Sequence, residues 1–141
     1  MIVEKKLKVY YFTAILSLLF AVIGFSYNAW RMELSEDNNN IRTASFEVLK
    51  ELAELERIIF AAHYDKNLIE GNPRKGWVEV GLIYDLSVLI NNDVEIKAAK
   101  LKNKWSGNWE RIAEDKQITE ELVMTIDEVR VEIKEVLSKL K

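Results

Sequence analysis

An uncharged, largely apolar stretch lies near the start of the sequence. Residues 9–30 contain no charged side chain over 22 positions, and the middle of the stretch is apolar on every side of a helix. At about 1.5 Å per helical residue the stretch spans roughly 33 Å, against about 30 Å for the hydrocarbon core of a bilayer. Tyr10 and Trp30 mark its two ends, as aromatic residues do at membrane interfaces. We therefore expect a transmembrane helix.

Apolar positions beyond this stretch repeat with the period of amphipathic helices. They recur at steps of three and four within residues 37–69 and again within residues 109–141, where the spacing is close to that of a coiled coil. Between these segments, residues 77–101 carry apolar groups on several sides, which is typical of a helix covered on more than one face. The sequence therefore predicts three long helices.

Two turn signals separate the predicted helices. Gly71 and Pro73 end the first, because glycine caps helices and proline cannot continue them. Residues 102–108 contain Ser-Gly-Asn and separate the second from the third. Short loops favour antiparallel neighbours, so we expect an all-α, up-down-up helical bundle. Residues 38–40 are three asparagines. They form either a kinked link or part of one long helix, in which case the anchor adds a fourth member.

Charge indicates how the chain is placed across the membrane. Lys5, Lys6 and Lys8 precede the apolar stretch, and this lysine bias favours a cytoplasmic N-terminus. We expect a cytoplasmic tail at residues 1–8, an anchor in inner-membrane lipid at residues 9–30, and a periplasmic or extracytoplasmic bundle at residues 31–141. Residues 1–30 carry a net charge of +2 and the remainder −5, so we expect no nucleic-acid partner.

A cleaved signal peptide is the alternative to a retained anchor. Its charged start and apolar middle have the same pattern, and Gly24-Phe25-Ser26 resembles a weak cleavage site. The apolar stretch exceeds the usual length of about 7–15 residues in a signal peptide, which favours the anchor. Cleavage would instead give a secreted protein.

Composition excludes most catalytic and metal-binding chemistry. The sequence has no Cys and one His, and it contains no glycine-rich phosphate loop. We therefore expect no enzymatic activity, no cofactor and no metal, and we assign no catalytic, cofactor-binding or metal-ligating residue.

A carboxylate in the apolar second segment is the first candidate site. Asp85 must find a hydrogen-bond donor, lose its charge or face solvent. Antiparallel packing would bring it near three basic side chains, those of Arg57, Arg130 and His63. We expect either a buried polar cluster of these four residues or a solvent-exposed Asp85.

Two further groups are candidates for surface contacts. Arg74, Lys75 and Trp77 form a basic and aromatic corner that would meet a partner or ligand, unless the charges are solvated and Trp77 closes the bundle end.

Tryptophans near the predicted membrane ends form the second group. Trp30 ends the anchor, and Trp105 and Trp109 would lie in the turn that points back to the bilayer. In that turn, Trp105 and Trp109 either rest on lipid or cap the hydrophobic core.

These features point to two functions. The first is a membrane-anchored bundle that acts through contacts with a protein partner or a second copy of itself. The second is a sensor or ligand-binding bundle that signals through a partner. The predicted architecture resembles, in general shape, the extracytoplasmic four-helix sensor domains of bacterial receptors, although no sequence motif carries the likeness.

Overall fold

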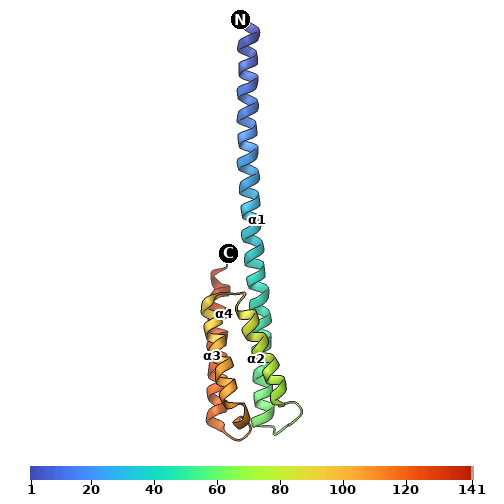
Figure 1. The fold of residues 1–141 in the computed structure, drawn as a ribbon, viewed down its shortest axis with the longest axis vertical. Coiled ribbons are helices and arrows are strands. Elements are labelled where there is room, and N and C mark those ends of the chain that lie inside the picture. The colour runs from blue at the N-terminus through green and yellow to red at the C-terminus, as the bar shows by residue number, and fades with distance from the viewer. Residues whose placement is uncertain (141) are drawn as a thin grey trace. The chain divides into compact units, whose positions relative to one another are not determined.

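The described chain consists of helices joined by turns. A computed structural model describes residues 1–140 and contains no strand among them, which confirms the all-α prediction (Figure 1). Its elements are α1 (Ile2–His63), α2 (Pro73–Ser87), α3 (Asn92–Asn108), the short 3-10 helix η1 (Trp109–Arg111) and α4 (Lys116–Lys139). Lys141, the last position of the third predicted helix, lies outside the described residues.

The chain divides into two compact units, Met1–Asp37 and a second unit that begins at Asn38. Helix α1 contributes to both and stays helical through residues 38–40, so the three asparagines do not break it. Within the first unit, α1 is long and apolar enough to cross a membrane, and none of its most apolar window is buried by other parts of the chain. This exposure is compatible with a lipid-facing surface.

The prediction of a single helix over residues 77–101 is wrong. The chain turns between α2 and α3, and Asn91 caps the start of α3 by accepting a hydrogen bond from the Val94 amide at 2.9 Å. An asparagine carboxamide satisfies an amide at a helix start that would otherwise lack a partner. Asn91 therefore begins a new helix and does not lie within one continuous helix. Thus four helical segments, not three, form the second unit.

Two other helix boundaries differ from the predictions. Helix α1 ends at His63, so the following connection spans residues 64–72. Residues 102–108, predicted as a turn, instead complete α3, and the turn follows η1. The side chain of Asp115 then caps α4 by accepting from the Ile118 amide at 3.1 Å.

The second unit has one hydrophobic core to which all four helices contribute. The predicted apolar seams of α1 and α4 are the faces that are buried, which confirms their helical period. The fully buried core side chains include Val48, Leu52, Leu55 and Ile59 of α1, Val80 and Ile83 of α2, Val94 and Leu101 of α3, and Leu122, Ile126, Val129 and Ile133 of α4.

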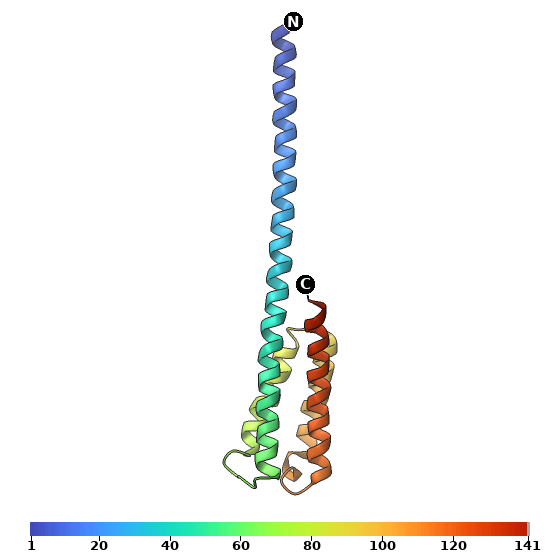
Figure 2. The same cartoon turned by 180° about the vertical axis from the view of Figure 1, so that it is seen from behind.

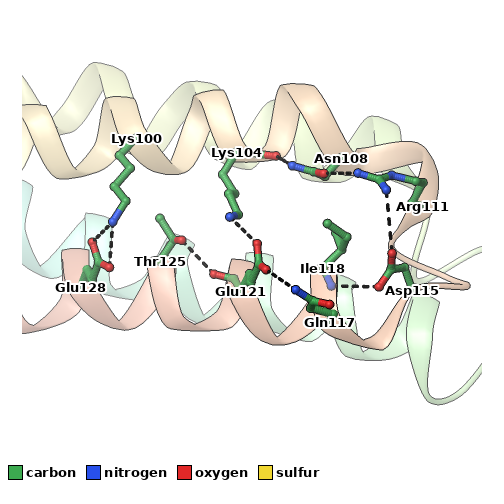
Figure 3. A network of polar contacts seen from close by, with 10 residues as sticks. All are labelled: Lys100, Lys104, Asn108, Arg111, Asp115, Gln117, Ile118, Glu121, Thr125 and Glu128. Atoms are coloured by element: carbon green, nitrogen blue, oxygen red, sulfur yellow. Dashed lines mark hydrogen bonds and ion pairs between the residues drawn. The ribbon is translucent and has the colours of Figure 1, made fainter.

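Ion pairs on the surface show how neighbouring helices run. Figure 3 shows Lys100 and Lys104 of α3 reaching Glu128 and Glu121 of α4, the first pair at 2.7 Å. The residue numbers rise along one helix as they fall along the other, so α3 and α4 are antiparallel. Within this unit α2 lies beside α3, and α3 lies beside α4 (Figures 1 and 2).

A close approach joins α2 and α3. Trp105 is 1% exposed and is the largest fully buried side chain among the described residues. Its ring lies where a side chain on Gly76 would be, because an added Cβ would come within 2.1 Å of the indole. Only glycine at position 76 leaves room for this ring.

Replacing Gly76 therefore tests the contact. Gly76→Ala should lower the free energy of unfolding by about 1–3 kcal/mol, because the new methyl group overpacks the core. Urea denaturation followed by tryptophan fluorescence measures the change.

Gly81→Ala is the matched control in the same helix. A Cβ at this position meets no atom within 4 Å, so alanine should raise the free energy of unfolding by about 0.5–1 kcal/mol through helix propensity. Equal effects of the two substitutions would contradict the role given to the Trp105 contact.

Candidate functional site

The polar cluster expected around Asp85 does not form. Asp85 is exposed, and within residues 1–140 it has no ion pair or hydrogen bond to a side chain. The inward face of α2 is formed instead by Val80, Ile83 and Ser87. The prediction assumed one continuous helix over residues 77–101. This assumption is wrong, because the chain turns after α2.

The three basic residues of the predicted cluster have other partners. Arg130 of α4 binds Glu56 of α1 at 2.9 Å, and both side chains are about three-quarters buried. This pair ties α1 to α4. Arg130 also binds Asp127 one turn earlier in its own helix.

Arg57 belongs to a different, exposed group. It contacts Glu54 at 2.6 Å and Glu70 at 2.7 Å. Hydrogen bonds from Arg57 hold the pKa values of both carboxyl groups below their usual range. The group attaches the 64–72 connection to α1.

His63 has a structural hydrogen bond. Its Nδ1 lies 2.8 Å from the carbonyl oxygen of Ile112, so the Nδ1–H tautomer donates to that oxygen. The contact joins the end of α1 to the turn before α4. Within residues 1–140, no three His, Cys, Asp or Glu side chains are arranged to hold a metal ion.

Arg74, Lys75 and Trp77 occupy the first turns of α2. Pro73 begins the helix, and the Asn72 side chain caps it by accepting from the Arg74 amide at 2.9 Å. Arg74 and Lys75 are exposed, and Lys75 lies 3.8 Å from Glu70. Trp77 is 38% exposed, and it is Trp105 that fills the core at this level, next to Gly76.

Helix α2 also presents an exposed apolar face. Val78 is 66% exposed, Leu82 is 39% exposed, and an added Cβ on Gly81 would meet nothing within 4 Å. Arg74 and Asp85 lie at the two ends of this strip, which we call the α2 face. Residues spaced by three and four share one side of a helix, so the strip is continuous.

The three candidate membrane-proximal tryptophans differ in their surroundings. Trp30 is 58% exposed and packs near Tyr27 in the first unit, with 6.2 Å between ring centroids. Trp105 is buried in the core of the second unit, so it does not offer its ring to lipid. Trp109 is half-buried and lines a pocket with Trp105, close to the end of α1. The structure therefore favours the core-capping alternative for Trp105.

A carboxyl pair between α1 and α2 was not predicted. Burial raises the pKa of Glu79 to about 7, and the carboxyl groups of Glu51 and Glu54 on α1 add to the rise. Glu79 Oε2 is buried and has no hydrogen-bond partner in the described part of the chain. The only signal in the sequence was that Glu79 interrupts an apolar segment, and this signal did not identify Glu51 as its neighbour.

No protein-family model, curated protein or solved structure matches this chain. Its function is therefore inferred from its own residues.

The Glu79 carboxyl group makes stability depend on pH. Because its pKa in the folded chain lies above the ordinary 4.5, folding takes up a proton between pH 4.5 and about 7. This contribution to stability is fully present at low pH and is lost as the pH rises through that interval. Glu79→Gln removes the ionised form, so it should raise the free energy of unfolding at pH 8 and leave it unchanged at low pH. Solvent screens this partly exposed group, so we expect a rise of about 1 kcal/mol.

Urea denaturation at several pH values measures this dependence. Glu114→Gln, at an exposed position in the turn before α4, is the control for removing a surface carboxyl group. A Glu79→Gln variant that parallels the natural chain across the pH range would contradict the assignment.

Proposed function

We propose that this chain is a single-pass membrane protein that holds an up-down helical bundle outside the inner membrane and acts through contacts with a partner protein. In this proposal residues 9–30 cross the bilayer and the N-terminal tail stays in the cytoplasm. The proposal assigns the chain no enzymatic activity.

The anchor is supported by the first unit. Its apolar residues are exposed, including Leu18 at 65% and Phe20 at 67%. Water around such a surface costs free energy in proportion to the apolar area, and the hydrocarbon core of a membrane removes that cost. The three lysines before the stretch support a cytoplasmic N-terminus.

The observation that carries the interaction role is the α2 face. Exposed single apolar residues are common on soluble proteins, but a continuous strip bounded by charges is typical of a binding surface. Arg74 and Asp85 form no ion pair within residues 1–140, so their charges remain available to a partner.

The order of the two charges along α2 specifies the order of complementary charges on the partner. Arg74 and Asp85 are 11 positions apart, which corresponds to about 16 Å along a helix. We propose that the α2 face binds a helix of another protein that has an acidic group opposite Arg74, a basic group opposite Asp85 and apolar residues between them. Complementary charges of this kind contribute to specificity and to the rate of association.

The same charges disfavour pairing of two copies through this face. Copies anchored in one bilayer are related by rotation about the membrane normal, which keeps each residue and its counterpart at the same height. Arg74 would then face Arg74 of the other copy, and Asp85 would face Asp85. Like charges in contact oppose association.

Membrane extraction tests the anchor. The full-length chain should stay in the membrane pellet after alkaline carbonate treatment, because the apolar helix is held by lipid rather than by surface charge. A tag fused after Lys141 should be digested by protease added to the periplasmic side. Release into the supernatant, protection of the tag, or loss of the first 24–26 residues from the mature chain would contradict the anchored topology.

Site-specific photo-crosslinking in intact membranes tests the α2 face. A photoreactive residue at Leu82 should give one discrete product with a different protein. The paired reversal Arg74→Glu with Asp85→Lys should reduce its yield several-fold, because both end charges then repel the partner.

Matched positions elsewhere on the bundle provide the controls. The same photoreactive residue at Val131 of α4, which is 64% exposed, should not give that product, and Lys134→Glu should leave the yield at Leu82 unchanged. Equal products from Leu82 and Val131 would contradict a binding role for α2. A crosslinked product made of two copies of this chain would contradict the proposed partner protein and indicate a homodimer.

A further inference from the structure

A pocket of about 330 Å³ lies at the end of the second unit where α1 finishes. Its walls are almost entirely apolar. They come from six segments at this end of the unit, and they include Ile59 and Ala62 of α1, Leu68 of the connection, Trp105 of α3, Trp109 of η1 and Ala113 before α4. This volume falls within the range of small-molecule sites, about 300–1,000 Å³.

Several close contacts fix the positions of the residues that line the pocket. The Trp105 ring is fixed against Gly76, and an added Cβ on Gly71 would come within 2.4 Å of the Ala62 backbone nitrogen. On the opposite side, the Ile112 carbonyl accepts hydrogen bonds from His63 at 2.8 Å and from Thr119 at 3.0 Å. The lining residues are therefore packed against the rest of the unit without a ligand, which is typical of a preformed site.

The charges beside the pocket favour an uncharged ligand. Glu110 is the one ionisable residue in the lining. The ammonium group of Lys66 donates to the Ala113 carbonyl, next to the same lining. One negative and one positive group at the rim offset each other, so neither a cation nor an anion gains a net attraction. A charged ligand would still lose its hydration on entering the apolar interior.

Two further features suit a small aromatic molecule. The indole N–H of Trp105 is buried and has no acceptor among residues 1–140, so one wall residue retains an unused donor. Leu68 contributes to the lining yet is 83% exposed, and burying its side chain against a ligand would remove apolar surface from water.

We propose that this pocket binds a small uncharged aromatic molecule, with Trp105 and Trp109 forming its walls and Leu68 its lip. The inference does not depend on the function proposed for the α2 face.

Three probes of similar size and different charge test the proposal. They are 1-naphthalenemethanol, 1-naphthalenemethylamine and 1-naphthoate, which are neutral, cationic and anionic near neutral pH. The full chain, in lipid nanodiscs to avoid detergent in the pocket, is titrated while the methyl NMR signals of Ile59 and Ile112 are recorded. The neutral probe should shift both signals saturably, and the charged probes should bind about tenfold or more weakly.

Two substitutions locate the binding. Ala113→Phe should abolish the shifts by filling the pocket, and Ala53→Phe, at an exposed position of α1 outside this lining, should not. Leu68→Asp, at the exposed lip, should weaken binding of the neutral probe several-fold without a loss of stability. This variant therefore tests the binding site if Ala113→Phe fails to fold.

Other outcomes would overturn the inference. If no probe shifts the Ile59 and Ile112 signals at millimolar concentration, the pocket is not a ligand site. If the charged probes bind as tightly as the neutral one, the assigned ligand class is wrong. Leu82→Glu on the α2 face should leave probe binding unchanged, which separates this test from that of the proposed function.

Discussion

The arrangement of the second unit depends on one large side chain occupying the space above a glycine. Trp105 contributes more buried volume than any other fully buried residue in the described chain, and the missing Cβ of Gly76 lets α2 approach its ring. This contact sets the level of α2 relative to α3. The same ring also provides one wall of the pocket at the end of α1. The pocket and the helix that carries the proposed binding surface thus share this local packing.

The helical character and most of the core were predictable, because both follow from periodic burial. Val48, Leu52 and Leu55 in α1, and Leu122, Ile126 and Val129 in α4, recur at helical spacing and are fully buried. The turn after α2 was not predicted, because residues 77–90 are apolar enough to continue a helix. In the structure, the side chain of Asn91 caps a new helix at this point. A single polar residue can stabilise a bend or a new helix start, and local sequence does not distinguish the two.

The candidate sites were harder to predict because they depend on contacts between helices. Arg130 was expected as a possible partner of Asp85, but its partner on a neighbouring helix is Glu56. The residues that line the pocket come from six segments, and none has an unusual sequence environment. The raised pKa of Glu79 also depends on contacts between helices, because it arises mainly from burial, with an added effect of Glu51 on the neighbouring helix. Spacing along the chain predicts which side chains share a face, and it leaves open which faces meet.

The lysines of α3 and the glutamates of α4 have a consequence for how this protein changes in evolution. Exposed ion pairs such as Lys100 with Glu128 contribute little to stability, so losing one is tolerated. Reversing one sign, however, places like charges opposite each other and penalises the native register relative to a shifted one. Substitutions at positions 100 and 128, and at 104 and 121, are therefore expected to occur in correlated pairs among related chains. The core beneath them is expected to vary mainly by exchanges that conserve volume.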